Sequence, residues 1–308
     1  MKRLVLVVGV GRSGTSLLAG VLGQLGFHIP QPEVTADDTN PKGFGEPRWV
    51  VDFHSRLMRR LRVIVFDARP VAFEKTAAVE DAAELRSWLA GELAQADDVV
   101  IKDPRVGWFL TLWKRACDGL DVQVGQVTML RHPAEILTSA RKSYGDWQSD
   151  ASRAAAWLNV MLETERQTRG ARRIYIRYED LLADWRAQMD RAGRVLELPL
   201  LTDIAPERAA AVDAFVDPGL HRARTGWEGL DVPERVSTLC DRVWELFVAG
   251  PEERAAELDA ALEEYRVLYR EAEAISQPSV TAVRPRKKAA PPTLRAKIAR
   301  RLRRLAGR

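Results

Sequence analysis

The first part of the chain constrains the fold more than any other segment. Leu4–Val8 is a short apolar run, and it leads directly into the stretch Gly9–Ser16, which reads GVGRSGTS. A short apolar run that stops at glycines predicts a buried strand, and the apolar residues of Ser16–Leu22 predict a helix after the glycine loop. A strand, a glycine loop and a helix in this order favour an α/β fold in which the helix N-terminus can bind an anion.

Strand-like and helix-like segments alternate over the first 200 residues. Helical spacing of apolar residues occurs in Glu80–Ala94 and Trp157–Thr168. Further short apolar runs predict strands at Val63–Phe66, Val99–Ile101, Val124–Leu130 and Arg173–Tyr178. This alternation predicts a P-loop-type parallel sheet flanked by helices over residues 1–200, followed by a helical C-terminal part over residues 201–275.

The last residues differ in composition from the rest. Residues 274–308 contain 11 Lys and Arg and no acidic residue. The formal net charge of the whole chain is +4, so residues 1–273 have a net negative charge. We expect a domain at 1–275, then a linker and a basic amphipathic tail at 276–308. In the tail, Leu294, Ile298, Leu302 and Leu305 form one apolar stripe, which suits an anionic membrane surface. A solubilising tail is the alternative, and nucleic-acid contact is a weaker one.

Cysteine content and hydropathy indicate the cellular compartment in which we expect the protein. Cys117 and Cys240 are the only cysteines, and no Cys/His cluster occurs, so we expect neither a disulfide framework nor a bound metal. The apolar run at the N-terminus is too short for a signal peptide, and no run approaches the roughly 20 residues of a membrane span. We therefore expect a cytoplasmic protein.

The glycine loop has the spacing of a Walker A motif with one change. Thr15 stands where a nucleoside-triphosphate enzyme has its lysine, and Arg12 is the cation of the loop. The loop keeps glycines whose amide groups can converge on a phosphate. We expect a phosphate site without the usual triphosphate contacts, and a plain β–α turn or a P-loop kinase are the alternatives.

A second candidate phosphate element follows the Val124–Leu130 run. Arg131 stands at the end of that predicted strand, and Ser139 lies about two turns along the next predicted helix. Arginine offers a planar fork to a phosphate, and a serine hydroxyl adds a compact donor. Lys102 similarly follows the Val99–Ile101 run, at the carboxyl end of a strand, where open parallel sheets bind their ligands.

These motifs resemble those of sulfotransferases that use 3′-phosphoadenosine 5′-phosphosulfate (PAPS), particularly the tyrosylprotein and bacterial carbohydrate branches. The resemblance runs from Lys2 to about Asp184. It implies that the first loop binds the 5′-phosphosulfate, and that an arginine and a serine eight residues later bind the 3′-phosphate. The implied PAPS-binding residues are Gly11, Arg12, Ser13, Gly14, Thr15, Ser16, Arg131 and Ser139.

The resemblance also suggests catalytic residues. Lys102 stands in a Lys-Asp-Pro triplet like one whose lysine lies beside the sulfuryl group in tyrosylprotein sulfotransferases, and Arg12 is a second cation. Glu46 follows an Asn-Pro-x-Gly-aromatic stretch that resembles one in bacterial members, and we expect it to be the base. Gly45 stands where those members have a bulky aromatic residue. His28 and Asp103 are the alternative bases.

The expected activity is transfer of a sulfuryl group from PAPS to an acceptor hydroxyl by in-line displacement, without a metal. A carbohydrate or glycolipid acceptor is implied at the level of the family, and the tail suggests peripheral contact with the inner membrane surface. Nucleic acid is not an expected partner. The alternatives are a P-loop kinase and a nucleotide- or glycan-binding protein without sulfotransferase activity.

Overall fold

The computed structural model describes residues 1–37, 40, 42–217, 219 and 226–283. The chain divides into two compact units, residues 1–269 and residues 270–308. In the second unit the described part is the end of helix α13, which spans Ala255–Val283. The sheet, the cores and the candidate site described below all belong to the first unit.

A four-stranded sheet is the centre of the first unit. Its strands are β1 (Lys2–Val8), β2 (Asp98–Lys102), β3 (Val122–Leu130) and β4 (Arg173–Arg177). They are ordered β2-β1-β3-β4 and all neighbouring pairs are parallel. Because parallel strands end on the same edge, the segments that follow them meet there. The predicted α/β fold with a helix-flanked parallel sheet is confirmed.

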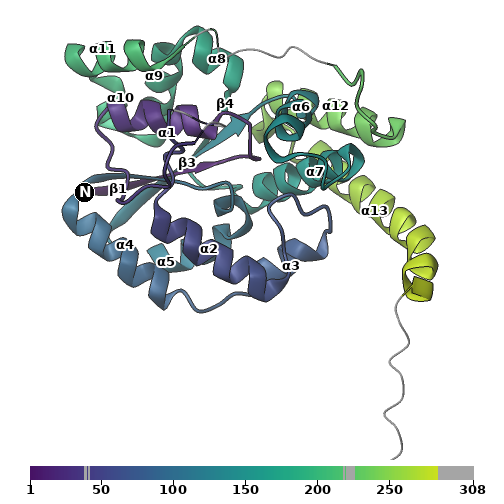
Figure 1. Cartoon of the computed structure of the whole chain (residues 1–308). Coiled ribbons are helices and arrows are strands. Elements are labelled where there is room, and N and C mark those ends of the chain that lie inside the picture. The colour runs from purple at the N-terminus through teal and green to yellow at the C-terminus, as the bar shows by residue number, and fades with distance from the viewer. Residues whose placement is uncertain (38–39, 41, 218, 220–225, 284–308) are drawn as a thin grey trace, which may run out of the picture. The chain divides into compact units, whose positions relative to one another are not determined.

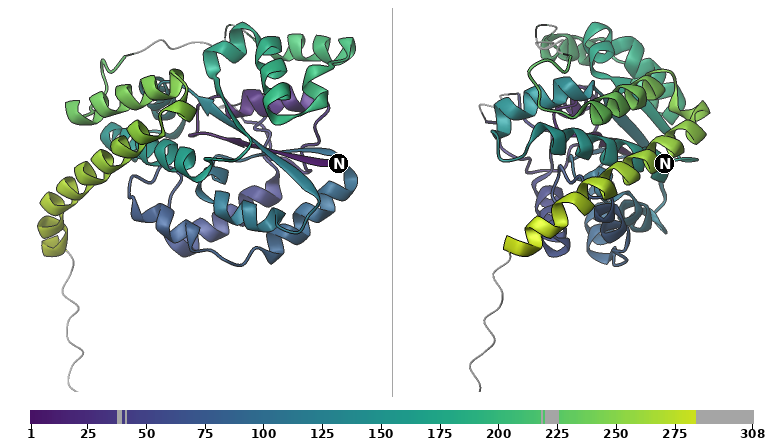
Figure 2. Two further views of the ribbon diagram at one scale, coloured as in Figure 1. Left: turned by 180° about the vertical axis from the view of Figure 1, so that it is seen from behind. Right: turned by 90° about the vertical axis from the view of Figure 1, so that its right-hand side faces the viewer.

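Helices cover both faces of the sheet, and successive side chains of β1 alternate between two apolar cores (Figures 1 and 2). Val5 and Val7 pack into one core, and Leu4, Leu6 and Val8 pack into the other. The first core includes α1 (Thr15–Gln24), α8 (Tyr178–Ala183), α9 (Trp185–Leu196), α10 (Pro199–Thr202) and α11 (Pro206–Phe215). This two-sided burial explains why the strands have apolar runs without alternating polar residues.

The other core is larger and includes elements from a longer stretch of the chain. Its elements are α2 (Arg48–Leu61), α3 (Val71–Ala77), α4 (Ala83–Gln95), η1 (Val106–Trp108), α5 (Leu110–Cys117), α6 (Pro133–Tyr144), α7 (Asp150–Gln167), α12 (Glu234–Val248) and the start of α13. A short helix, η3 (Pro251–Glu253), precedes α13. The C-terminal part of the first unit is helical, as predicted.

Two predictions about local structure are wrong. Val63–Phe66 is not a strand, although Val63 and Phe66 are buried, because the segment turns away from α2 and packs against the helices without a neighbouring strand. The predicted linker begins too early, because α13 continues through Pro278 to Val283. A proline removes one backbone hydrogen bond and can kink a helix without ending it. The basic amphipathic segment 293–305 lies outside the described residues.

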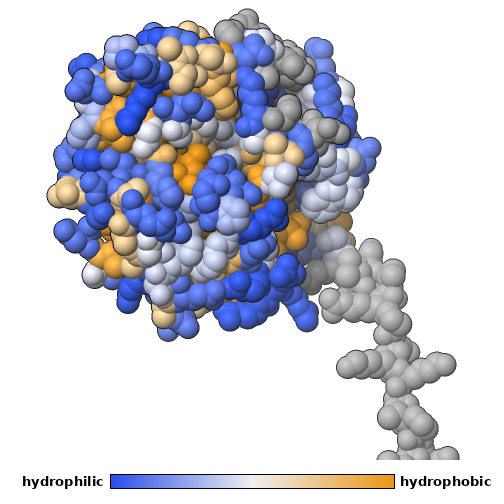
Figure 3. All heavy atoms as spheres, turned by 60° about the vertical axis from the view of Figure 1, so that its left-hand side comes forward, coloured by the Kyte–Doolittle hydropathy of each residue, from blue (hydrophilic) through white to orange (hydrophobic). Residues whose placement is uncertain are grey.

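The visible surface is mainly hydrophilic, with hydrophobic side chains gathered in small areas (Figure 3). Among the described residues, no helix combines the length and the apolar character that crossing a bilayer requires.

Candidate functional site

A cavity of about 1050 Å³ opens at the carboxyl edge of the sheet. It is lined by the segments that follow β1, β2, β3 and β4, together with the loop before α2. Of the residues predicted from the sequence, those that line the cavity are Gly11, Arg12, Gly14, Thr15, Ser16, Glu46, Lys102, Arg131 and Ser139. Ser13 is the exception, because its side chain is turned inward and is buried.

The loop between β1 and α1 has a conformation that requires its glycines. Gly14 has a φ of 96° and forms the N-cap of α1, and Arg12 also has a positive φ, of 75°. A Cβ atom at Gly14 would run into the ring of Tyr178. The first amide groups of α1 have no acceptors within the helix, so this end of the cavity is suited to an anion.

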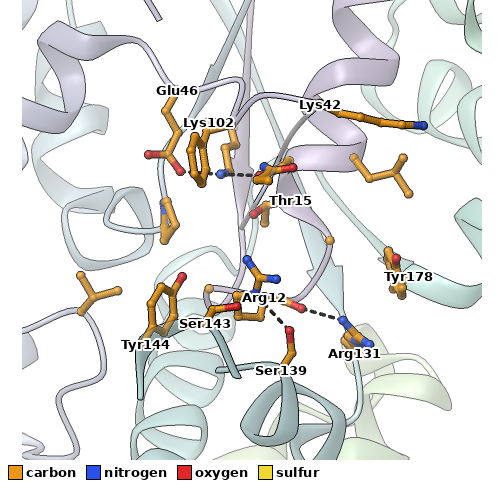
Figure 4. A pocket seen from close by; sticks show the side chains of 18 of the residues that line it. Arg12, Thr15, Lys42, Glu46, Lys102, Arg131, Ser139, Ser143, Tyr144 and Tyr178 are labelled. Atoms are coloured by element: carbon orange, nitrogen blue, oxygen red, sulfur yellow. Dashed lines mark hydrogen bonds and ion pairs between the residues drawn. The ribbon is translucent and has the colours of Figure 1, made fainter. Parts of the chain in front are cut away.

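Arg131 and Ser139 both contact the loop through Arg12 (Figure 4). Nη1 of Arg131 donates a hydrogen bond to the carbonyl oxygen of Arg12 at 3.1 Å. Nε of Arg12 donates to Oγ of Ser139 at 3.0 Å. The Arg131 guanidinium also lies over the ring of Tyr178, 4.7 Å from its centroid, and its Nε donates to Glu135 at 2.9 Å. The two predicted phosphate elements therefore form one cluster.

Lys102 and Glu46 form a buried ion pair beside the start of α1 (Figure 4). Nζ of Lys102 donates to Oε1 of Glu46 at 2.5 Å and to Oγ of Ser16 at 3.0 Å. Both side chains are buried, with Glu46 8% exposed and Lys102 2% exposed. Burial raises the pKa of Glu46 above its ordinary value, although the charge of Lys102 opposes the increase. A carboxylate with a raised pKa next to a cation is suited to accept a proton.

The loop before α2 places Glu46 through tight packing. The carbonyl oxygen of Glu46 accepts a hydrogen bond from the amide of Val34 at 2.8 Å. Gly45 has a φ of 63°, and a Cβ atom there would lie 2.7 Å from Cβ of Ala19 in α1. The small residue at position 45, where a bulky aromatic residue was expected, is thus explained by the close approach of the loop to α1.

The two alternative bases lie outside the cavity. His28 pairs through its Nε2 with Glu92 at 2.9 Å, and its backbone bonds to that of β2. Asp103 is fully buried, and both of its carboxylate oxygens accept hydrogen bonds, one from His54 and one from Arg105. Burial alone would raise the pKa of Asp103, but these hydrogen bonds and charges lower it to about 2. Neither residue is placed to deprotonate an acceptor.

His54 belongs to a buried chain that the sequence analysis did not find. Nε1 of Trp113 donates to Nε2 of His54 at 3.1 Å, so the other ring nitrogen carries the hydrogen. That nitrogen, Nδ1, donates to Oδ2 of Asp103 at 2.7 Å. His54 lies on α2, a helix that was not predicted, and a single histidine among apolar residues gives no signal of such a partner.

Several further side chains line the cavity. Lys42 donates from Nζ to the carbonyl oxygen of Phe215 at 2.5 Å and so connects the loop before α2 with the end of α11. Lys142, Tyr144 and Tyr178 also line it. Among the described residues, no group of three or more His, Cys, Asp and Glu side chains is arranged to hold a metal ion.

Comparison with known proteins places the chain in a family. The model of the sulfotransferase family matches residues 5–203. No curated protein matches the sequence. Among solved structures, the sulfotransferase domain of the Synechococcus PCC 7002 olefin synthase has 19% sequence identity and a TM-score of 0.44, with 80% of this chain and 94% of that chain covered. The sulfotransferase domain of the curacin biosynthetic pathway has 14% identity and a TM-score of 0.46, with 80% and 98% covered.

A third structure, sulfotransferase STF1 from Mycobacterium tuberculosis H37Rv, has 16% identity and a TM-score of 0.38, with 69% of this chain and 71% of that chain covered. The match of the family model extends from β1 to the region of α10, and so includes the glycine loop, Glu46, Lys102 and the Arg131–Ser139 segment. The chain belongs to the sulfotransferase family.

Proposed function

We propose that the protein is a PAPS-dependent sulfotransferase that moves the sulfuryl group of PAPS to an acceptor hydroxyl. The observation that carries the proposal is the ion pair of Lys102 and Glu46, which lies against Ser16 at the start of α1. This pair puts a cation and a candidate base next to the place where a phosphate-binding helix would hold the 5′-phosphosulfate. Membership of the sulfotransferase family supports the reaction.

The cluster around Arg12 is the proposed donor site. The amide groups at Gly14–Ser16, together with Arg12, would hold the 5′-phosphosulfate, while Arg131 and Ser139 would hold the 3′-phosphate. Arg12 bonds to Ser139 and Arg131 bonds to the carbonyl of Arg12, so the residues proposed for the two phosphates already contact one another. Preorganised charge of this kind stabilises an anion without first rearranging the protein.

The proposed chemical step is an in-line displacement at sulfur. The acceptor hydroxyl gives its proton to a carboxylate oxygen of Glu46, and its oxygen forms a bond to sulfur. The bond between sulfur and the phosphate oxygen of PAPS breaks, and 3′-phosphoadenosine 5′-phosphate (PAP) leaves with the electron pair. Lys102 and Arg12 stabilise the negative charge that develops on the leaving oxygen. The contact between Lys102 and Glu46 loosens as the hydroxyl engages Glu46.

Transfer of label from ³⁵S-PAPS tests this proposal. The acceptor panel contains oligosaccharides, glycolipids, tyrosine peptides and small phenols. We expect labelled product from the wild-type protein, and a large loss with Lys102→Met, which removes the charge but keeps most of the side-chain volume. If PAP binds and no acceptor in the panel becomes labelled, the protein is a nucleotide-binding member without this activity.

The proposed acceptor is a carbohydrate or glycolipid, as in the bacterial carbohydrate branch, and the proposed location is cytoplasmic. The basic segment of residues 293–305, with its apolar stripe, suggests contact with the inner membrane surface. Co-sedimentation with vesicles of phosphatidylglycerol and phosphatidylethanolamine compares the full chain with a chain that ends at residue 283. Equal sedimentation of both would exclude a role for the tail in membrane contact.

A further inference from the structure

The cavity has two ends with different linings. In Figure 4, Arg131 and Tyr178 lie on one side of the phosphate loop, and Glu46 and Tyr144 lie on the other. The side of Glu46 and Tyr144 is where an acceptor must approach, because Glu46 is the proposed base. The lining there includes the apolar or aromatic side chains Phe44, Val65, Phe66, Pro104, Tyr144 and Trp147, with Arg105 among them.

Arg105 is held in place by the fully buried carboxylate of Asp103. Both its backbone amide and its Nη1 donate to Oδ1 of Asp103, at 3.1 and 2.7 Å. The other oxygen of Asp103 accepts from His54, whose ring is in turn held by Trp113. Asp103, His54 and Trp113 are each completely buried. This chain of hydrogen bonds fixes where the Arg105 guanidinium can lie.

The rest of the guanidinium is available to a ligand. Among the residues that the structure describes, Nε and Nη2 of Arg105 donate to no other group. The side chain is 23% exposed and lines the cavity. Burial opposes its charge, but Asp103, Glu46 and Tyr144 all favour it, and the net effect raises the pKa of Arg105. A permanent positive charge with two unused donors therefore faces the acceptor end.

Asp103 balances the charge of Arg105 but engages only one of its side-chain nitrogens, Nη1. Glu46 is paired with Lys102, and Asp103 is shared between Arg105 and His54. When Glu46 takes up the acceptor's proton, the charge of Lys102 is available to the leaving oxygen, and Arg105 keeps its contact with Asp103. A negative group on the acceptor could accept hydrogen bonds from Nε and Nη2 of Arg105, and charge-assisted hydrogen bonds are strong in a partly apolar site.

We propose that Arg105 binds an oxyanion of the acceptor, a carboxylate or a phosphate ester, beside the hydroxyl that becomes sulfated. This inference rests on the proposed function and narrows its acceptor class to anionic hydroxyl compounds. The planar fork of arginine matches the two oxygens of such a group. Tyr144, which is 46% exposed, and Trp147, which is 62% exposed, are placed in the lining to contact the remainder of the acceptor.

The test compares matched anionic and neutral probes. Isothermal titration of the PAP complex measures 4-hydroxyphenylacetate against 4-hydroxyphenylacetamide, methyl glucuronide against methyl glucoside, and phenyl phosphate against phenol. We expect the anion to bind at least about tenfold more tightly in one or more pairs, which is the effect of one charge-assisted hydrogen bond. The first two pairs test carboxylates, and the third tests a phosphate ester.

Three variants connect any preference to Arg105. Arg105→Gln should abolish the preference, and Arg105→Lys, which can still pair with Asp103, should keep part of it. Lys142→Gln removes the same charge from another residue of the cavity lining and should leave the preference intact. Equal binding within all three pairs, or a preference that persists in Arg105→Gln, would overturn the proposal.

Titration of PAP alone separates the two proposals. If PAP binds to the wild-type protein and no anion preference is found, the acceptor inference is wrong and the donor site stands. If PAP does not bind, the proposed function itself is wrong. A thermal unfolding curve for Arg105→Gln shows whether the loss of its contact with Asp103 has disturbed the buried hydrogen bonds of Asp103, His54 and Trp113.

Discussion

At the scale of single residues, the pair of Glu46 and Lys102 dominates the site. Its two charges are almost completely removed from water, and Lys102 also donates a hydrogen bond to Ser16. Removing one partner from a buried pair typically costs about 3–5 kcal/mol of stability, because the other charge stays buried and uncompensated. Variants that keep the shape of the residue are therefore the appropriate tests of mechanism.

Glu46→Gln should lower kcat by about 10²- to 10⁴-fold, which is the usual contribution of a positioned base. The amide can still accept a hydrogen bond from Lys102 but cannot take up the acceptor's proton. PAP affinity should be nearly unchanged, because Glu46 does not belong to the proposed phosphate cluster. Steady-state kinetics with PAPS, together with a PAP titration, measure the two effects. Near-normal turnover would remove Glu46 from the role of base.

The raised pKa of Glu46 predicts the pH dependence of the reaction. A base must be deprotonated, so kcat should fall as the pH decreases through the pKa of Glu46. Burial places that pKa above the ordinary value of 4.5, and the decline should begin correspondingly closer to neutrality. A pH profile of kcat measures this decline, and the profile of Glu46→Gln should lack it. An identical acidic limb in both proteins would assign the titration to another group.

The sequence was more informative about the donor residues than about the residues that support them. Gly14 and Arg12 were found because a glycine loop after an apolar strand has a recognisable pattern, and the structure shows why position 14 tolerates no side chain. His54 and Arg105 were not found, because their arrangement depends on α2, β2 and α5 packing together. Such long-range contacts leave no local pattern in a single sequence.

At the scale of elements, the loop between α1 and α2 determines where the base lies. It crosses α1 so closely that Gly45 contacts Ala19, and Glu46 follows immediately. The loop is connected to α11 through the hydrogen bond of Lys42 with the Phe215 carbonyl. The position of Glu46 is thus set by backbone packing against a helix that also begins at the phosphate loop.

A pair of glycine variants tests this packing. Gly43 and Gly45 both have a positive φ, of 88° and 63°, but a Cβ atom at Gly43 meets nothing within 4 Å. Each alanine variant should lose about 1–2 kcal/mol of stability from backbone strain. Only Gly45→Ala should also displace Glu46, so only it should lower kcat strongly. Chemical denaturation and kinetics measure these effects, and equal kcat losses in both variants would contradict the account.

The strands were easier to predict than the helices. Val99–Ile101 and Val124–Leu130 are apolar runs because helices bury both faces of the sheet, and burial of this kind is visible in the sequence. Val63–Phe66 is an apolar run of the same kind, but it has no neighbouring strand. Burial of side chains alone does not determine which segments pair as strands. Helices α2, α3 and α5 were not predicted, although α2 and α5 are amphipathic and bury one face.

At the scale of the whole molecule, the parallel sheet explains how distant segments form one site. The glycine loop and Arg131 each follow a strand, and Lys102 is the last residue of one. The strand order β2-β1-β3 puts these three strands next to one another, with the glycine loop in the middle. Their convergence follows from the topology, because neighbouring parallel strands end at the same edge. The positions of these residues at strand ends were therefore sufficient to predict that they lie near one another. They did not predict the contact of Arg12 with Ser139.

The most direct test of the central claim is the binding of PAP compared with ADP and ATP by calorimetry and thermal unfolding. PAP has the 3′-phosphate that Arg131 and Ser139 are proposed to hold, and ADP and ATP lack it. We predict that PAP binds at least about tenfold more tightly than either, and that PAP at 100 times its Kd adds about 2.7 kcal/mol of stability. Tighter binding of ATP than of PAP, or no stabilisation by PAP, would contradict a PAPS site.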